Sequence, residues 1–312
     1  MNESKKTSFG ILDFGYREKK LNSLSIIEDV IDYASAADEL GFSRFWISEH
    51  HDPNTVLAWS NPQPMVSILA GITKRIKIGA AGVLIGIHNP YHVATHFKLL
   101  ANLFPNRIDL GIARSVVNPV AIQCVTRTDN IGNEEMMKTI PKKIQYLLHY
   151  LRDEEELFKK GAGIVIPPYK GDIPNLWMLG SSYNSLSNAL ELGLNFSRSI
   201  FHPGADQMAH REELEKFQEA YIQKHKKIPK INLVLSGFCA KTQQQAEKIA
   251  NEQKLKPESH IFGCKNKFYD TINTYINDFG VDEIILKIPP HKLSDRTNCI
   301  HLISDMFKLN VN

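Results

Sequence analysis

Several features that mark specialised classes of protein are missing from this sequence. Its 312 residues include only four cysteines, and no two of them have the spacing of a metal-binding knuckle or a redox pair. The longest apolar stretch, residues 78–87, contains three glycines and is far shorter than the ~20 residues that span a bilayer. No apolar segment of signal-peptide length follows the basic N-terminus. These absences predict a reduced, cytoplasmic protein without a membrane partner.

Charge and glycine patterning exclude two further classes. The formal net charge is only +3, so charge predicts no nucleic-acid partner. No Gly-x-Gly-x-x-Gly fingerprint is present, which argues against tight binding of a nicotinamide dinucleotide. With 43% hydrophobic and 23% charged residues, the composition is that of an ordinary globular protein. Since no repeat, low-complexity tract or linker is visible, we expect a single domain over residues 1–312.

Short β-branched apolar runs alternate with longer amphipathic ones along the chain, which is typical of repeated βα units. The predicted strands cover residues 8–12, 42–48, 76–80, 108–112, 176–179, 195–200, 231–239 and 283–288. The predicted helices cover residues 26–40, 62–73, 91–103, 134–153, 185–192, 205–225, 243–253, 268–277 and 302–309. This pattern predicts an α/β fold, a (β/α)₈ TIM barrel, which takes about 250 residues plus insertions. Residues 114–133 show neither period, so we expect a long functional loop there.

Active sites of such barrels lie at the C-terminal ends of the strands, so the residues at strand ends are the candidates. Those expected near the mouth are Asp13, Glu49, His50, His51, Arg114, Gly180, Ser181, Arg198, His202 and Lys287. Lys287 is an unusual residue for a barrel strand. It could contact an anionic substrate, or simply extend its ammonium group into water.

Two of these strand ends favour binding of a phosphorylated ligand. Gly180, Ser181 and Ser182 stand between a strand and a helix, where backbone N–H groups and hydroxyls can hold a phosphate. The serines could equally be helix N-caps. Arg114 could supply a charge-assisted contact to the same phosphate, or pair with Asp109 or Glu49.

The second strand ends in a short polar cluster formed by Glu49, His50 and His51. A histidine can exchange protons near neutral pH, which makes His50 and Glu49 candidates for acid–base catalysis. The alternatives are a structural histidine at the rim and a metal site, although three consecutive residues do not place three ligands on one face. No metal is predicted. Ala80, Ala81 and Gly82 end the third strand with small side chains, which either let a flat ring approach or only pack tightly.

In four stretches the sequence resembles the bacterial-luciferase-like flavin-dependent monooxygenases. Residues 41–51, GFSRFWISEHH, resemble the second strand of that family and its Glu-His-His ending. Residues 76–114 include IKIGAAGVL and PNRIDLGIAR, which are similar to the family's third and fourth strands. Residues 176–182, LWMLGSS, resemble its fifth strand and phosphate-binding turn, and residues 280–286, GVDEIIL, its last strand.

The resemblance implies a barrel that binds flavin mononucleotide (FMN) in reduced form as a co-substrate, with a deazaflavin as the alternative cofactor. It implies a two-component monooxygenase that acts on paired donors, incorporates molecular oxygen into a small-molecule substrate, receives reduced flavin from a separate flavin reductase and forms a homodimer. His50 matches the family's catalytic histidine. Ala80, Ala81 and Gly82 match the wall behind the flavin ring, where a non-proline cis peptide can occur. The alternatives are an FMN- or deazaflavin-dependent reductase or dehydrogenase, and a flavin-binding protein without turnover.

The sequence departs from the family in two places. Ala113 stands where the light-emitting members have a reactive cysteine, so light emission is not expected. Residues 115–119, SVVNP, replace the turn that many relatives carry after the arginine, so the resemblance does not extend to the substrate. The stretch between the last two predicted strands is also short, which suggests a more open mouth.

Overall fold

The structure of the chain is a computed structural model. It describes residues 7–16, 22–51, 56–126, 132–160, 163–202, 205, 207–289 and 292–310. Residues 127–131, which belong to the loop expected over residues 114–133, lie outside the described residues, as do residues 1–6 at the N-terminus.

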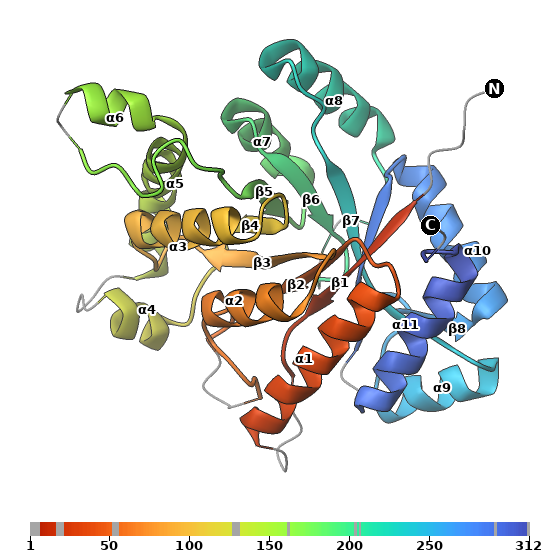
Figure 1. Cartoon of the computed structure of the whole chain (residues 1–312). Helices are drawn as coiled ribbons and strands as arrows, with labels where there is room; N and C mark the ends of the chain where they lie inside the picture. Colours follow the sequence, from red (N-terminus) through yellow and green to blue (C-terminus); the bar gives the residue numbers. More distant parts are fainter. Residues whose placement is uncertain are drawn as a thin grey trace.

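Eight parallel strands form a closed barrel, which confirms the predicted (β/α)₈ class (Figure 1). In the order in which they pair, the strands are β1 (Ser8–Asp13), β2 (Arg44–Ile47), β3 (Lys77–Leu84), β4 (Ile108–Ala113), β5 (Asn175–Gly180), β6 (Asn195–Ser199), β7 (Ile231–Ala240) and β9 (Glu283–Lys287). Pairing of β9 with β1 closes the ring. A further strand, β8 (Ile261–Cys264), pairs only with the C-terminal part of β7.

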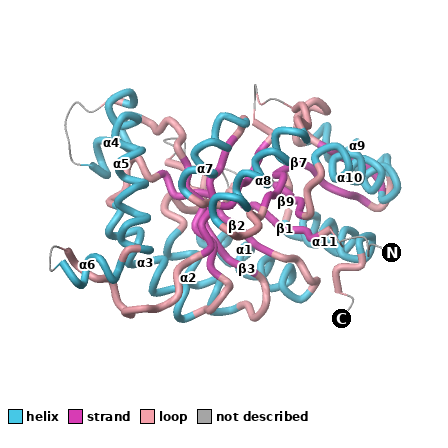
Figure 2. The backbone as a smooth tube through the Cα atoms, turned by 90° about the horizontal axis from the view of Figure 1, so that it is seen from above, coloured by secondary structure: helices cyan, strands magenta, loops and turns pink. Residues whose placement is uncertain are grey.

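Helices surround the barrel, as the view from above shows (Figure 2). They are α1 (Ser23–Glu39), α2 (Gln63–Ile72), α3 (Pro90–Leu103), α4 (Pro119–Thr126), α5 (Asn133–Arg152), α6 (Glu154–Lys160), the 3₁₀ turn η1 (Tyr183–Ser185), α7 (Leu186–Leu192), α8 (Arg211–His225), α9 (Gln243–Glu252), α10 (Lys265–Phe279) and α11 (Leu293–Phe307). The main apolar core lies between these helices and the outward side chains of the strands. No helix among the described residues combines the length and the apolar character needed to cross a membrane.

Local sequence signals account for the helix ends. The Asn22 side chain caps α1 by accepting a hydrogen bond from the Ser25 N–H at 2.8 Å. Gly193 and Gly280 end α7 and α10 with φ values of 60° and 62°, the left-handed conformation that glycine adopts without a steric cost. These signals set the helix lengths, and thus where each following strand begins.

The inward side chains of the barrel form layers. At the N-terminal end Arg44 pairs with Glu283 at 2.8 Å and with Asp109. Trp46 lies one layer higher and donates its indole N–H to Asp109 at 2.9 Å. Trp177 stands edge-on to Trp46 in the same layer. These layers fill the N-terminal part of the barrel interior, below the C-terminal mouth.

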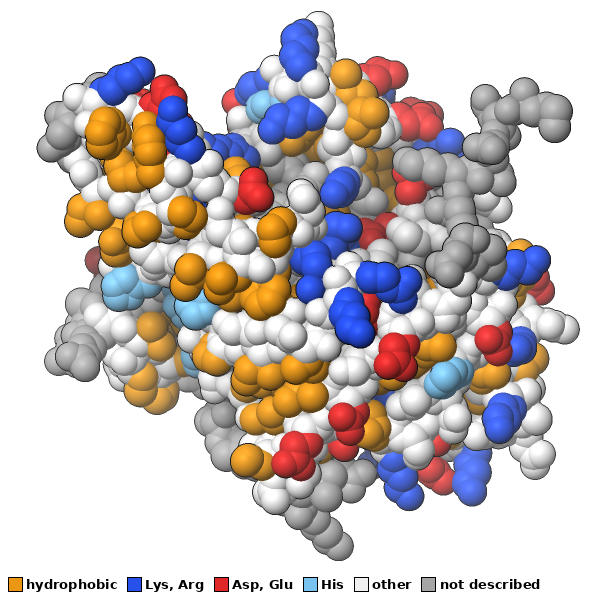
Figure 3. All heavy atoms as spheres, in the orientation of Figure 1, with side chains coloured by type: hydrophobic (Ala, Val, Ile, Leu, Met, Phe, Trp, Pro, Cys, Tyr) orange, Lys and Arg blue, Asp and Glu red, His pale blue; other side chains and the backbone are white. Residues whose placement is uncertain are grey.

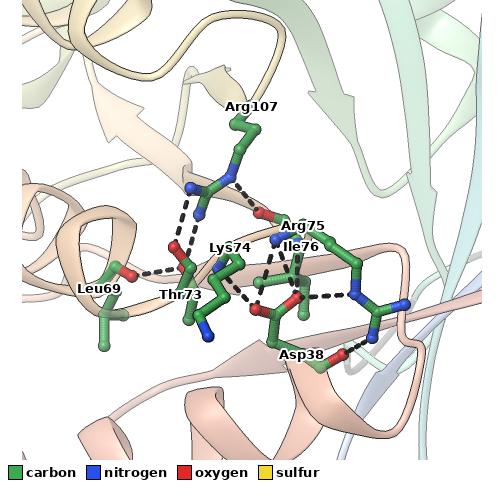
Figure 4. A network of polar contacts seen from close by, with 7 residues as sticks. All are labelled: Asp38, Leu69, Thr73, Lys74, Arg75, Ile76 and Arg107. Atoms are coloured by element: carbon green, nitrogen blue, oxygen red, sulfur yellow. Dashed lines mark hydrogen bonds and ion pairs between the residues drawn. The ribbon is translucent and has the colours of Figure 1, made fainter.

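A polar network closes the opposite, N-terminal face of the barrel (Figure 4). The Asp38 carboxylate, at the end of α1, accepts hydrogen bonds from the backbone amides of residues 74–76. Arg107 donates to the carbonyl oxygens of Thr73 and Ile76 at 2.9 and 3.1 Å. The network fixes the turn between α2 and β3 and has no contact with the mouth, so we assign it to stability.

Four expectations at the level of elements are wrong or incomplete. The segment 114–133 is not irregular throughout, because α4 forms within it around the fully buried Ile122. The helix expected over residues 205–225 begins only at Arg211, and the last helix begins at Leu293 rather than at residue 302. The short elements α6 and β8 were not predicted.

Candidate active site

A cavity of about 240 Å³ opens at the C-terminal mouth of the barrel. Trp46, Leu12 and Val234 form its floor, which continues the inward layers of the barrel. Its rim comes from the ends of several strands and includes Phe201 and His202 after β6. Sequence reasoning missed the floor, although the alternation of side chains along each strand carries that signal.

Most of the predicted site residues meet in this cavity. Those that line it are Glu49, His50, Ala81, Gly82, Arg114, Gly180 and Ser181. Ala80 and Ser182, the other two residues predicted for the flavin site, do not line it. Neither do four residues expected near the mouth, Asp13, His51, Arg198 and Lys287. Ala80 is fully buried in the core between barrel and helices, because its side chain points outward from β3. Ser182 follows the turn, is half-buried, and makes no capping hydrogen bond with its side chain.

One wall of the cavity consists of backbone and small side chains at the end of β3. The peptide bond between Ala81 and Gly82 is cis, as the family resemblance suggests for this strand. A Cβ atom on Gly82 would lie 2.5 Å from Leu179 Cδ1 and 2.7 Å from the Gly111 carbonyl oxygen. Only glycine fits at this position, which leaves the wall flat on its cavity side.

Arg114 faces the cavity from the end of β4. Its Nη2 donates to Ser185 Oγ at 2.7 Å, while its buried Nε has no partner among the described residues. Neither of the ion pairs considered for it forms, because Asp109 pairs with Arg44 and Glu49 bonds two histidines. A donor of Arg114 is thus available to an anionic ligand beside Gly180 and Ser181.

The helix after Gly180 is short, which changes how this turn would bind a phosphate. The turn leads into η1 and then into α7, which has only seven residues. A Cβ atom on Gly180 would lie 2.9 Å from Ser185 Oγ, the hydroxyl that Arg114 contacts. Ser181 and Arg114 thus lie together at this turn, which a short helix follows.

The Glu49 carboxylate is a fixed acceptor beside the cavity. It accepts hydrogen bonds from His51 Nε2 at 2.9 Å, from His88 Nε2 at 2.6 Å and from the Leu84 amide at 2.9 Å. Burial alone would raise the pKa of Glu49, but the hydrogen bonds from the two histidines lower it to about 2. Glu49 is therefore ionised at any physiological pH. It joins the end of β2 to the segment between β3 and α3, through His88, which sequence reasoning did not select.

His50 differs from Glu49 because its ring is exposed at the cavity. It stacks on Phe14, with the ring centroids 4.9 Å apart. Phe14 in turn meets Phe201 edge-on at 6.1 Å. Aromatic packing therefore contributes to the position of the ring at the cavity. Among the described residues, no group of three or more His, Cys, Asp or Glu side chains is arranged to hold a metal ion.

Lys287, at the end of β9, lies beside the same aromatic cluster. Its ammonium nitrogen is 4.6 Å from the centroid of the Phe14 ring, 4.8 Å from that of Phe201 and 5.4 Å from that of Tyr16. Burial lowers the pKa of Lys287 to about 8. Of the two roles considered for this residue, extension into water does not describe its position, because the side chain is half-buried among these rings.

Comparison with known protein families gives a match over most of the chain. The model of the family described as luciferase-like monooxygenase matches residues 7–275. Among individual proteins, YwcH of Bacillus subtilis (strain 168) is 30% identical, over 96% of this chain and 99% of that protein. An N-acetyl-S-alkylcysteine monooxygenase of the same organism is 28% identical, over 74% of this chain and 67% of its own.

Solved structures share the fold over the whole chain. The apo form of MsnO8 is similar with a TM-score of 0.82 and 23% identity, covering 99% of each chain. The oxygenating constituent of 3,6-diketocamphane monooxygenase from Pseudomonas putida, solved with FMN, has a TM-score of 0.73 at 18% identity, covering 98% and 99%. An F420-dependent secondary alcohol dehydrogenase has a TM-score of 0.68 at 13% identity, covering 98% and 100%. At these identities the likeness establishes the fold alone.

Proposed function

The chain belongs to the luciferase-like monooxygenase family, and on this premise we propose that it is the oxygenase of a two-component monooxygenase, which uses reduced FMN and molecular oxygen on a small organic substrate. One observation carries the proposal. A single cavity brings together a flat wall at Gly82, an arginine donor without a protein partner at Arg114 and an exposed histidine at His50.

The residues present fit FMN. Arg114, Gly180 and Ser181 would hold its phosphate, since the buried Nε of Arg114 has no other acceptor among the described residues. Ala81 and Gly82 would form the wall behind the ring system, because both line the cavity with little or no side chain of their own. Bound reduced FMN would supply the electrons that activate oxygen.

The chain's own contribution is shape, orientation and proton control. The apolar floor of Leu12, Trp46 and Val234 keeps water out of the bottom of the cavity. We assign His50 the transfer of a proton at its exposed imidazole, since it is the histidine of the predicted cluster that faces the cavity. Glu49 stays ionised with its acceptors occupied, so we assign it to positioning the loop around His50 rather than to proton transfer.

Reduced flavin would come from a separate reductase. Two features support this part of the proposal. The sequence has no dinucleotide fingerprint of its own, and the diketocamphane monooxygenase protein is named as the oxygenating constituent of its system. The small-molecule substrate would enter from the open mouth.

A deazaflavin-dependent dehydrogenase is the second candidate. It is favoured by the shared fold of the F420-dependent secondary alcohol dehydrogenase, which extends over nearly the whole of both chains. The two proposals differ in what the protein binds and in whether oxygen is consumed.

Anaerobic titration of the purified protein with reduced FMN tests the first proposal. We expect tight binding to the wild type and, in Arg114→Gln, binding about tenfold weaker or more, because a charge-assisted contact to phosphate is lost. Riboflavin, which has no phosphate, should bind both proteins equally and serves as the matched control. When the complex of protein and reduced FMN is then mixed with oxygen, oxygen should be consumed. The His50→Gln variant should form product more slowly once a substrate is found.

Three results of these titrations would count against the proposals. Binding of F420 with no binding of FMN would establish the dehydrogenase candidate instead. If Arg114→Gln weakened the binding of riboflavin and of FMN equally, Arg114 would not be the residue that binds the phosphate. Absence of binding by either cofactor would contradict both proposals.

A further inference from the structure

Lys287 places an ammonium group among aromatic side chains at the end of β9. It follows Ile285 by two residues on β9, so its side chain points into the barrel like that of Ile285. Three aromatic rings surround its Nζ, those of Phe14, Tyr16 and Phe201. No Asp or Glu of the described residues forms an ion pair with it. Phe14 and Phe201 also line the cavity, so the ammonium lies directly beside it.

Lys98 provides a comparison, because its contacts are those of a buried ammonium group with a structural role. Lys98 of α3 is fully buried, pairs with Glu154 and donates to the Ile166 carbonyl oxygen at 2.7 Å. Glu154 neutralises its charge, and two of its three N–H groups have acceptors. Among the described residues, the contacts of the Lys287 ammonium are aromatic ring faces, which offset only part of the desolvation of a cation. No carboxylate among the described residues neutralises it.

Two histidines and a serine of the described residues lie near Lys287. Burial lowers the pKa of His202 and of His260, and in both cases the nearby charge of Lys287 lowers it further. Ser236 lies beside Lys287 in the register of β7 and β9, and its buried hydroxyl has no partner among the described residues. The Ser236 hydroxyl and the Lys287 ammonium, which lie side by side, form a site that favours a compact anion.

We propose that Lys287 binds an anionic group of the substrate, a carboxylate or sulfonate, while the apolar body of the substrate lies in the cavity against Phe14 and Phe201. This assignment rests on the proposed function for the identity of the cavity as a substrate site. Phe14 contacts both the Lys287 ammonium and the His50 ring, so an anion held at Lys287 would place the attached apolar body next to His50. Lys287 is on this basis a specificity-determining residue, and it selects substrates with one compact anionic end.

The test measures binding of simple probes to the whole protein, without a known substrate. Hexanoate and hexanesulfonate are titrated against the intrinsic tryptophan fluorescence, to which Trp46 in the cavity contributes, and hexanamide serves as the neutral probe of the same length. The wild type should bind one or both anions about tenfold more tightly than hexanamide. Lys287→Met should lose that difference and bind hexanamide as before. Whether hexanoate or hexanesulfonate binds more tightly distinguishes the two sources of anion.

Two further variants keep the outcome decisive. Lys287→Gln replaces Lys287→Met if the latter does not fold, as judged by its thermal melting. Arg114→Gln tests the other cation of the cavity, which is the donor proposed for FMN phosphate. Loss of anion binding in Arg114→Gln but not in the Lys287 variants would overturn the proposal, as would equal binding of hexanoate and hexanamide by the wild type or no binding of any anion.

These measurements separate the inference from the proposed function. They are made on the protein without flavin and repeated with saturating oxidised FMN. If FMN does not bind but hexanoate binding depends on Lys287, the flavin proposal fails and the anion site stands. If FMN binds as expected while hexanoate binding is the same in wild type and Lys287→Met, the anion site fails alone.

Discussion

At the residue scale, two side-chain positions decide the shape of the cavity, and they act by different physical means. Glu49 acts through hydrogen bonds, because its carboxylate accepts from His51, His88 and the Leu84 amide. Gly82 acts through the absence of a side chain, because a Cβ atom there would meet Leu179 and the backbone of Gly111. Each can be changed by a small substitution whose effect the contacts predict.

Glu49→Gln should destabilise the protein by about 3 kcal/mol at neutral pH, since the lowering of the Glu49 pKa from 4.5 to about 2 corresponds to that free energy. The pKa is lowered in the folded state, so this contribution is complete above pH about 4.5 and is lost as the pH falls towards 2. Urea unfolding at pH 7, 5 and 3 measures it. The gap in free energy of unfolding between wild type and variant should narrow at the lowest pH.

Glu212→Gln is the matched control, because Glu212 is a surface residue whose ion pair with Lys216 is highly exposed. We expect its effect to stay within about 0.5 kcal/mol at each pH. If the difference in free energy of unfolding between wild type and Glu49→Gln stayed constant from pH 7 to pH 3, this would contradict an ionised, hydrogen-bonded Glu49.

Gly82→Ala should destabilise the protein by about 1–3 kcal/mol and abolish FMN binding, because the added methyl group overlaps backbone atoms that cannot move aside. Gly71→Ala, in α2, is the matched control. A Cβ atom at Gly71 meets nothing within 4 Å, so alanine should stabilise the helix by up to about 1 kcal/mol. Thermal melting and FMN titration of both variants measure the two effects. A Gly82→Ala protein that binds FMN normally would remove this wall from the flavin site.

At the scale of elements, the sequence predicts those whose stability comes from local pattern. The strands Ile108–Ala113 and Glu283–Lys287 were predicted to within a residue because isoleucine or leucine occupies their outward positions Ile108, Leu110, Ile112, Ile284 and Leu286. The elements that were missed depend on distant partners. Glu154–Lys160 reads as a charged, exposed segment, and only Lys98 of α3, far away in the sequence, shows why Glu154 is buried there.

The residues of the candidate site divide in the same way, into those that the local sequence predicts and those that depend on distant parts of the chain. The strand-end rule places His50, Arg114 and Gly180 at one mouth because barrel topology alone brings strand ends together. The rule does not distinguish a residue that faces the cavity from one that faces the core, and Ala80 was assigned to the site for that reason. Phe14, Phe201 and His88 come into the site through the path of the loops, which local sequence does not encode.

The pair of Lys98 and Glu154 provides the test at this scale. Lys98→Met leaves Glu154 without its cation in a buried place, so we expect a loss of about 3–5 kcal/mol in the free energy of unfolding. The double variant Lys98→Met/Glu154→Gln should recover a substantial part of that loss, because no charge then remains unpaired. Chemical denaturation of the wild type, both single variants and the double variant measures the coupling. Additive effects would mean that the two side chains do not interact.

At the scale of the whole molecule, two helices on one side of the barrel expose an apolar surface. Ile68 and Ile72 of α2 are 44% and 43% exposed, and Leu99 and Leu103 of α3 are 53% and 60% exposed. The two helices are neighbours, since Ser67 Oγ lies 3.5 Å from His96 Nε2. Apolar side chains gather over this face in Figure 3. We propose that it forms the interface of a homodimer, because a two-fold axis lets one patch cover its own copy.

Charge introduced into this surface should separate the two copies. The variant Leu99→Glu/Leu103→Glu places like charges on both sides of a two-fold interface, where they would be buried without partners. We expect a dimeric wild type and a monomeric variant at micromolar concentration, as measured by sedimentation velocity. Ile228→Glu is the control, because Ile228 is 71% exposed and lies beyond α8, outside α2 and α3. Since the cavity is lined by strand ends and loops of one chain, the monomeric variant should still bind FMN. A monomeric wild type, or dissociation by Ile228→Glu alone, would place the exposed face of α2 and α3 outside any interface between copies.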